Sequence, residues 1–303
     1  MNSFRHIYLQ KVVTFLLFNP KLVHQVLKNR HMKILGEILT EEEQKWILDI
    51  DPRRWSIDLE RPHRSLEGAL FHCPVTGLAL SSFLYEVRHT NKKYSNPLLY
   101  LLKFYQSSHF SDCIQNDHYL VDSLIAWIFN DLTLKKFPKT QRKSLTILKS
   151  IIRVEQEVIK IKRRVINNNI STELSEHSIL KLGEKYCLLP SQHGVAEVYL
   201  ALNQKAISIT QTRQRADLLL GRIKLTSLPI DIKQTQLILI EKQGVNVSVE
   251  SLSDGLAEVL KLAQNGISFT QLIDYLCTEE MTEDEARELI NSWKKDGLIL
   301  SKS

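Results

Sequence analysis

The chain has 303 residues, of which 43% are hydrophobic and 24% are charged, and a formal net charge of +6. These values are typical of a globular protein with two domains, and no apolar run approaches the length of a membrane span. Four scattered cysteines without a CxxC pair indicate reduced thiols, so we expect a cytoplasmic protein.

The charge is uneven along the chain. Residues 190–303 hold 12 Lys and Arg against 15 Asp and Glu, which leaves the first 189 residues with 28 against 19. The basic part would suit nucleic acid, a membrane surface or an acidic protein, and charge alone does not choose among them.

The N-terminal half reads as helical, with no strand pattern. One or two helices over 6–30 break near Asn19-Pro20, because proline starts a helix more readily than it continues one. Thr40 and Glu43 form a capping box for a helix that is expected to turn Trp46, Ile47 and Ile50 to one side. Further helical periodicity follows over 53–72, 78–88, 97–106 and 118–132.

A long basic helix is predicted over 139–166. Its apolar positions are spaced four, three, four, three and four residues apart, namely Ile147, Ile151, Val154, Val158, Ile161 and Val165. This seam either packs inside the helical domain or associates with a second copy, and four heptads without ordered flanking charges favour packing inside. We place a hinge at 167–169, a domain boundary after residue 188, a strand over 195–200 and a short helix over 211–222.

The last third predicts a hairpin followed by three helices. The apolar run 237–240 and the alternating segment 245–250 flank a Gln243-Gly244 turn, with Val245, Val247 and Val249 on one face and Asn246, Ser248 and Glu250 on the other. Helices then follow with a stop at Asn265-Gly266 and capping boxes at Ser268–Gln271 and Thr282–Glu285. With a last strand over 298–300 after Gly297, the pattern predicts an α+β protein: a mostly helical N-terminal domain (1–188), then a winged helix-turn-helix (189–303).

The predicted third helix does not suit DNA. It would have to enter the major groove with a basic face, yet residues 255–303 hold nine acidic and five basic residues. Phosphate contacts need the opposite sign. The same elements resemble the leader-peptide recognition modules of ribosomal peptide modification systems, in which a peptide adds as a strand to the hairpin edge.

No motif indicates catalysis in this chain. P-loop, dinucleotide, GxSxG and HExxH patterns are absent. His109, Cys113 and His118, with Asp112 and Asp117 beside them, come nearest to a metal site, but structural zinc usually needs tighter paired ligands, so we expect no metal here. The densest remaining cluster is DPRRWSIDLERPHR at 51–64, which is either a protein interface or an internal Arg–Asp network.

The segment LTEEEQKWILDIDPRRWSIDLERPHRSLEGAL (39–70) resembles the N-terminal signature of accessory subunits of methanobactin-type biosynthesis. The resemblance extends loosely to the late strands and helices and does not cover roughly 75–190. It implies a non-catalytic subunit paired with an iron-dependent TIM-barrel oxidase. Iron and chemistry would lie in the partner, which turns cysteines of a ribosomal precursor peptide into oxazolone and thioamide groups.

The resemblance also implies two surfaces. The partner interface would involve Asp51, Arg53, Arg54, Trp55, Asp58 and Arg61. The leader peptide would lie along Val245, Asn246, Val247, Ser248 and Val249, against Glu285, Glu288 and Leu289. The acidic third helix would suit a basic leader, because charge complementarity sets specificity and association rate. No cofactor in this chain, no nucleic acid and no membrane are expected.

Two other functions remain open. The strongest alternative is a winged-helix transcription regulator in which the basic helix 139–164 meets DNA. A third is a helical scaffold without a ligand, which would bind no partner at any salt concentration.

Overall fold

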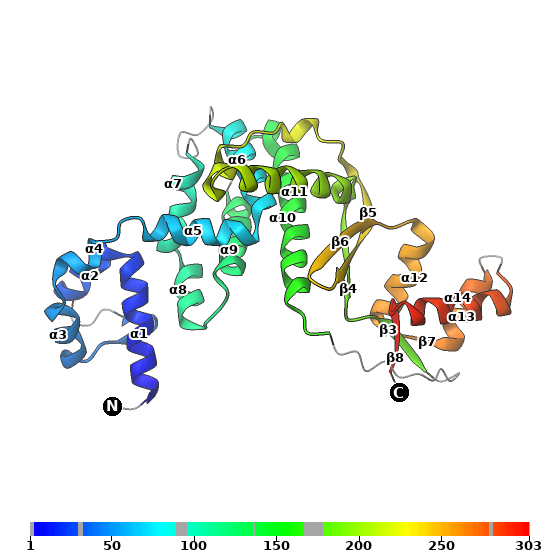
Figure 1. Ribbon diagram of the computed structural model, residues 1–303, viewed down its shortest axis with the longest axis horizontal. Helices are drawn as coiled ribbons and strands as arrows, with labels where there is room; N and C mark the ends of the chain where they lie inside the picture. Colours follow the sequence, from blue (N-terminus) through cyan, green and yellow to red (C-terminus); the bar gives the residue numbers. More distant parts are fainter. Residues whose placement is uncertain are drawn as a thin grey trace. The chain divides into compact units, whose positions relative to one another are not determined.

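The structure is a computed structural model that describes residues 3–29, 33–88, 96–135, 137–166, 178–278 and 281–302. It combines many helices with small antiparallel sheets, so the predicted α+β class is confirmed (Figure 1). The chain folds into two compact units, one made of residues 1–148 and 205–225 and the other of 149–204 and 226–303. This division does not follow the predicted boundary after residue 188. The predicted hinge at 167–169 lies outside the described residues.

The first unit begins with four helices and a small hairpin whose two strands have two residues each. Their bounds are α1 (Ser3–Phe18), α2 (Pro20–Lys28), β1 (Lys33–Ile34), β2 (Glu37–Ile38), α3 (Glu41–Asp49) and α4 (Pro52–Ser56). The predicted break at Asn19-Pro20 is confirmed, but the expectation of no strand in this half is wrong. Strands of two residues are too short to show an alternating pattern.

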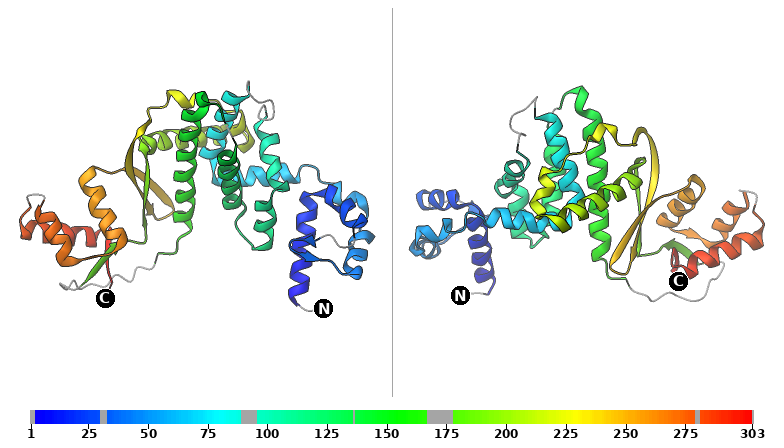
Figure 2. Two further views of the ribbon diagram at one scale, coloured as in Figure 1. Left: turned by 180° about the vertical axis from the view of Figure 1, so that it is seen from behind. Right: turned by 45° about the horizontal axis from the view of Figure 1, so that its top comes forward.

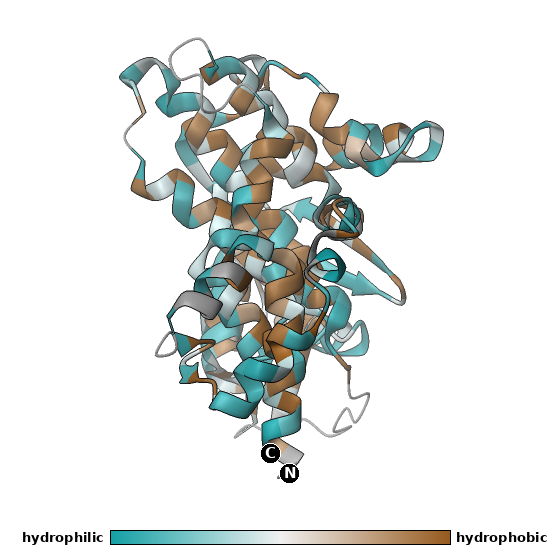
Figure 3. Ribbon diagram, turned by 90° about the vertical axis from the view of Figure 1, so that its left-hand side faces the viewer, coloured by the Kyte–Doolittle hydropathy of each residue, from teal (hydrophilic) through white to brown (hydrophobic). Residues whose placement is uncertain are grey.

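These first elements share a small hydrophobic core, to which α1 contributes Leu9, Val12 and Leu16. Ile47 of α3 and Trp55 of α4 close it from the other side. In Figure 3, which faces this part of the molecule, apolar and hydrophilic residues alternate around the helices, as expected where each helix buries one side. The core therefore fixes how α1, α3 and α4 lie against one another.

The rest of the first unit is a helical bundle. Its elements are α5 (Arg61–His72), α6 (Pro74–Val87), α7 (Pro97–Leu102), η2 (Lys103–Gln106), α8 (Ser108–Gln115), α9 (Leu120–Leu134), η3 (Lys139–Gln141), the start of α10 (Arg142–Arg163), the end of α11 (Val195–Thr212), η4 (Arg215–Leu220) and η5 (Leu225–Ser227). Helix α6 is buried along nearly its whole length. Phe18 of α1 stacks on Tyr105 and meets Phe110 of α8 edge-on, which ties the first helices to the bundle.

Helix α10 confirms the predicted long helix, and its seam is buried within the chain. Ile147, Ile151, Val154, Val158 and Ile161 are each at most 5% exposed. The expectation that the seam packs inside the protein is therefore confirmed for these five positions. Val165, the last predicted position, lies beyond the helix end and is exposed.

The second unit contains two three-stranded antiparallel sheets. Its elements, besides parts of α10 and α11, are β3 (Ile179–Leu182), β4 (Tyr186–His193), β5 (Asp231–Gln243), β6 (Asn246–Ser251), α12 (Asp254–Asn265), β7 (Ile267–Ser268), α13 (Phe269–Thr278), α14 (Glu283–Lys295) and β8 (Ile299–Lys302). One sheet has the strand order β4-β5-β6 and the other β7-β3-β8. The β5–β6 hairpin lies beside β4 (Figures 1 and 2).

Two expectations for residues 195–222, which run from the second unit into the first, need correction. Residues 195–200 begin helix α11 instead of a strand, because Gly194 (φ +86°) ends β4 and Val195, Val198 and Leu202 are buried at helical spacing. Over 211–222, Gln211 and Thr212 end helix α11 and Arg215–Leu220 form a separate 3₁₀ helix, so the predicted short helix is not continuous. The hairpin pairs with β4 and shares no sheet with the last strand β8, which pairs with β3.

Helices α12–α14 enclose a second core with β3, β7 and β8. It contains Val259, Phe269, Leu272, Ala286 and Ile290, together with Leu180 from β3. The capping boxes at Ser268–Gln271 and Thr282–Glu285 are both confirmed by reciprocal hydrogen bonds. Local signals therefore placed these helices correctly, while the strand that completes their sheet comes from about a hundred residues upstream.

Candidate functional sites

Strand β6 is an edge strand, and it is the place where a peptide could add to the sheet. It pairs with β5 from Asn246 opposite Gln243 to Ser251 opposite Ile238, and no other strand of the described part of the chain pairs with it. An open row of backbone N–H and C=O groups accepts an additional strand. At its end, the Ser251 hydroxyl donates to Glu197 Oε1 at 2.7 Å and fixes this edge to α11.

The geometry of the turn decides which donors face the open edge. Gly244 (φ +63°) and Val245 form a two-residue loop, so the flanking pair Gln243–Asn246 exchanges hydrogen bonds and the next pair, Lys242–Val247, does not. The Lys242 N–H instead donates to the Lys185 carbonyl, on the β4 side, at 2.8 Å. The backbone N–H of Val247, and by the same alternation that of Val249, is thus directed to the open edge.

The side chains of this segment follow the predicted alternation only from residue 246 onward. Val249 is buried, Val247 and Ser248 are half-buried, and Asn246 is exposed. Val245 is 90% exposed, so its expected place on the buried face is wrong. The reason is that the two-residue loop consumes Val245, and the strand begins one residue later.

Helix α14 holds the other residues predicted to bind the peptide. Glu285 accepts a hydrogen bond from the Thr282 backbone N–H at 2.8 Å, which lowers the pKa of its carboxyl. Glu288 is exposed, and Leu289 packs against the core around α12–α14. Helix α14 packs mainly against α13 and β8, whereas β6 belongs to the β4-β5-β6 sheet. One half of the predicted peptide site therefore lies beside the β7-β3-β8 sheet, and the other half is part of the β4-β5-β6 sheet.

The DPRRW segment is divided between interior and surface. Trp55 is buried in the N-terminal core. Asp51 caps α4 by accepting the Arg53 N–H at 2.9 Å, which holds its pKa below the ordinary value, and it also pairs with the Arg53 guanidinium at 3.1 Å. Arg54 is exposed. Of these four predicted interface residues, Arg53 and Arg54 therefore face solvent.

The following residues form an internal ion network. Asp58 accepts a hydrogen bond from Arg64, which lowers the pKa of Asp58, and Arg61 Nε lies 3.5 Å from the same carboxylate. Arg61 also donates to the Leu17 carbonyl at the end of α1 at 3.3 Å. Asp58 and Arg61 thus connect α5 to α1.

Two exposed apolar residues beside this network were missed from the sequence. Ile57 is 79% exposed and Leu59 70% exposed, both in the short connection between α4 and α5. The helix expected over 53–72 is interrupted here, since α4 ends at Ser56 and α5 begins at Arg61. The available signal was that Ile57 and Leu59 lie two positions apart, about 200° around a helix, so one helix could not turn both toward the core. Together with Arg53 and Arg54 they provide the apolar and arginine contacts that protein interfaces favour.

The residues with the nearest metal-ligand spacing already have protein partners. Of these residues, Cys113, Asp117 and His118 line a cavity of about 540 Å³ beside α1. Lys11 Nζ contacts Asp117 Oδ2 at 2.5 Å, Cys113 Sγ donates to the His118 carbonyl at 3.2 Å, and His109 Nε2 lies 2.9 Å from Asn130 Nδ2. Burial raises the pKa of the Cys113 thiol. Across the described ranges, no three His, Cys, Asp or Glu side chains are grouped so as to hold a metal ion.

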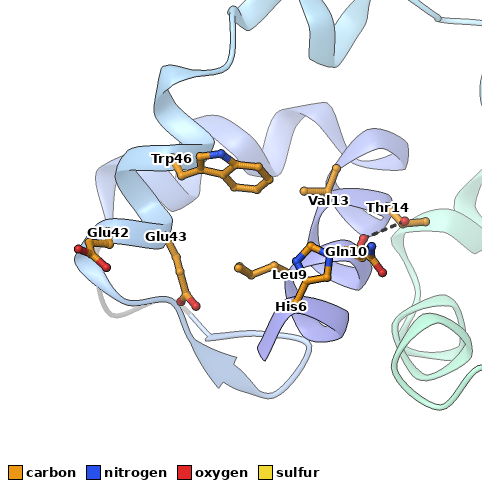
Figure 4. Close-up of a pocket in the computed structure, with 8 residues that line it drawn as sticks. All are labelled: His6, Leu9, Gln10, Val13, Thr14, Glu42, Glu43 and Trp46. Carbon is orange, nitrogen blue, oxygen red and sulfur yellow. Dashed lines mark hydrogen bonds between the residues drawn. The ribbon is translucent and has the colours of Figure 1, made fainter. Parts of the chain in front are cut away.

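A second cavity, of about 640 Å³, lies between α1 and α3 and was not predicted. Leu9 and Val13 of α1 face Trp46 of α3 across it (Figure 4). Trp46 is 53% exposed, whereas Ile47 is fully buried, so the expectation that both lie on one side of α3 is wrong. Adjacent helix positions point about 100° apart, which prevents both from facing the core.

No protein-family model matches the chain, and no curated protein matches it in sequence. Among the described helices, none is by itself long and apolar enough to cross a membrane; α5 and α6 reach that length and apolarity only as a pair bent by 112°.

Proposed function

We propose that this chain is a non-catalytic subunit that binds the leader of a ribosomal precursor peptide and pairs with an iron-dependent TIM-barrel oxidase. The observation that carries the proposal is the open edge of β6, with the Val247 N–H directed away from β5. The resemblance of residues 39–70 to methanobactin-type accessory subunits supports it independently. In this proposal the iron and the conversion of cysteine to oxazolone and thioamide groups belong to the partner.

The three C-terminal helices are proposed to form a winged-helix-like unit. Helix α12, strand β7, helices α13 and α14 and strand β8 follow one another in the order expected of such a unit. The middle strand of its sheet, β3, is contributed from upstream of the hairpin. The acidic start of α14 (Glu283, Asp284 and Glu285) supports peptide recognition over DNA reading, because phosphates would be repelled.

The peptide is proposed to add antiparallel or parallel to β6 along residues 246–249. Backbone hydrogen bonds to Val247 and Val249 would provide affinity, and the exposed side chains of Asn246 and Glu250 would contribute specificity. Glu288 on α14 is exposed and would favour a basic peptide when the leader extends beyond the sheet.

The oxidase is proposed to contact the connection between α4 and α5. Arg53, Arg54, Ile57 and Leu59 are all exposed there. Trp55 supports this surface through the N-terminal core, and the ion pair of Asp58 with Arg61 supports it through the ion network. A rigid support of this kind limits the ordering entropy that binding has to overcome.

Co-expression with the neighbouring gene products, followed by size exclusion and mass spectrometry, tests the proposal. An iron-containing partner and a small peptide with an oxidised mass are expected to co-purify. Recovery of the chain with bound nucleic acid that nuclease removes would overturn the proposal in favour of a transcription regulator. Recovery without any partner at low and high salt would support the helical scaffold.

Strand addition has its own test. Val247→Pro removes an N–H directed to the open edge and leaves the β5–β6 hydrogen bonds of the neighbouring pairs in place, so peptide binding is expected to fall at least tenfold. Val247→Thr keeps the N–H and the branched shape and serves as the matched control. Unchanged binding by a folded Val247→Pro protein would reject strand addition at β6.

The proposed oxidase surface is tested by charge reversal. Arg54→Glu is expected to dissociate the heterocomplex and to change the free energy of unfolding by less than about 0.5 kcal/mol, since Arg54 is exposed. Arg142→Glu, at an exposed arginine of α10, is the control and should leave the complex intact. A large loss of stability in Arg54→Glu would instead show an internal role.

A further inference from the structure

The cavity between α1 and α3 has an apolar floor and helical walls. Leu9 is buried at its base, Val13 is half-buried, and the exposed ring of Trp46 covers it from α3 (Figure 4). An exposed tryptophan beside a concave apolar surface is unusual on a monomer and typical of an interaction site.

The polar groups that line the cavity are mostly engaged within the protein. Glu43 is paired with Arg5 and accepts the Thr40 N–H at 2.8 Å. The Thr14 hydroxyl donates to the Gln10 carbonyl at 2.9 Å. A small-molecule site needs several convergent polar groups to orient its ligand, and this arrangement provides few of them.

The spacing of the lining residues suits a third helix. On α1 they lie at positions i, i+3, i+4 and i+7, namely His6, Leu9, Gln10 and Val13. On α3 they include Glu42 and Trp46, four residues apart. Rows at these spacings form the ridges and grooves into which another helix packs, and an amphipathic helix lies in such a groove through its own i, i+3, i+4 and i+7 residues.

The charged residues around the cavity indicate which charge a bound partner should carry. Helix α3 contains Glu41, Glu42, Glu43 and Asp49 against a single Lys45. Within the described ranges, Glu42 lines the cavity without an ion pair, while Glu43 is held by Arg5. The α3 side of the rim is therefore acidic, whereas α1 contains Arg5 and Lys11 and the first 189 residues as a whole carry a net positive charge.

We propose that the α1–α3 groove binds a basic amphipathic helix of a partner protein. Bulky apolar residues of that helix contact Leu9, Val13 and Trp46, and a Lys or Arg beside them pairs with Glu42. The inference goes beyond peptide binding at β6 and does not depend on it, because the groove belongs to the first unit and β6 to the second.

Three designed peptides test the proposal on the full chain. The probe is an 18-residue helical peptide of Leu, Ala and Lys with a leucine stripe at i, i+3, i+4 and i+7, and its controls are a scrambled peptide of the same composition and a Glu-for-Lys version. Binding is measured by anisotropy of the labelled peptides. The probe is expected to bind at least tenfold more tightly than either control and to shift tryptophan emission to the blue, a shift that Trp46→Phe removes.

Variants of the groove locate the binding. Val13→Asp and, as a second variant at an exposed lining residue, Thr14→Arg should each weaken the probe at least tenfold. Glu42→Lys should weaken the Lys peptide and strengthen the Glu peptide. Leu134→Asp removes an exposed leucine outside the groove and is the matched control. Equal binding of the probe and the scrambled peptide, or full binding by Thr14→Arg, would overturn the proposal.

Discussion

Helices α3 and α14 begin with the same local sequence and have different roles. Both have a threonine N-cap and a glutamate three residues later, and in both the reciprocal capping bonds form. Glu43 is only 5% exposed and is also bonded to Arg5 of α1, 38 residues away. Glu285 is exposed, and among the described residues it bonds only within its own capping box. A shared motif thus stabilises only a helix start at α14, whereas at α3 it also joins the helix to α1.

The electrostatics of the two glutamates differ in the same way. The pKa of Glu43 is lowered first by its hydrogen bond to Arg5, and that of Glu285 first by the Thr282 backbone N–H. The first effect comes from tertiary structure and the second from the capping box alone. Five substitutions separate these two contributions.

The largest effect is expected for Glu43→Ala. This change removes a capping acceptor and leaves Arg5 without its buried partner, which costs roughly 3–5 kcal/mol in a fully buried pair. Because the Arg5 side chain is 26% exposed, solvent screens it and we expect a loss of about 2 kcal/mol in the free energy of unfolding of the first unit. Urea unfolding measures it, with the exposed neighbour Glu42→Ala as control. A loss no larger than in the control would contradict the joining role.

Removal of the two N-cap hydroxyls should have similar, smaller effects. Thr40→Ala and Thr282→Ala each remove a capping acceptor, which costs about 1 kcal/mol. Hydrogen exchange of α3 and α14 reports the local stability of each helix in the intact chain. A much greater loss for Thr40 would show that the hydroxyl, and not only Glu43, takes part in the tertiary contact.

Titration distinguishes the causes of the two lowered pKa values. A carboxyl whose pKa is lower in the folded state stabilises the protein above its ordinary pKa of 4.5, and this stability is lost as the pH falls through the folded value. Arg5→Gln should raise the pKa of Glu43, so that the stability contributed by its ionised carboxylate is lost at a higher pH. The same substitution should not change the pKa of Glu285. Carbon-13 NMR of labelled glutamate side chains measures both. A parallel shift of both carboxyls would refute a specific Arg5 effect.

The smallest effect is expected for Glu285→Gln. The amide can still accept the Thr282 N–H, and the side chain is exposed, so melting of the second unit should change less than in Thr282→Ala. Differential scanning calorimetry compares the two variants. A greater loss in Glu285→Gln would mean that Glu285 has a tertiary partner.

Signals that act within a few residues were interpreted correctly. The Asn19-Pro20 break, the three capping boxes and the long helix α10 all lie where the sequence predicts them. The hairpin also forms, with its turn one residue later than predicted, at Gly244-Val245. The predicted burial is wrong at two positions where a shift of one residue changes which side chain faces the core. Val245 enters the turn instead of the strand, and Trp46 faces outward because Ile47 occupies the core.

Strand β4 shows why some elements were missed. It contains Pro190, which argues against a central strand, and it is tolerated because β4 lies at the edge of its sheet, with Pro190 opposite Leu237. Strand β3 has only four residues and takes its place between β7 and β8. Neither position follows from local periodicity, since pairing partners lie about fifty to more than a hundred residues away.

The sequence by itself determined the helix starts, the hairpin and the buried seam of α10, because capping bonds and side-chain periodicity act between residues a few positions apart. Only the tertiary structure decided that Glu43 meets Arg5, that β6 keeps an open edge and that Trp46 covers a groove. Those features depend on which distant segments pack together. Identical capping boxes at Thr40 and Thr282 carry no information about that packing.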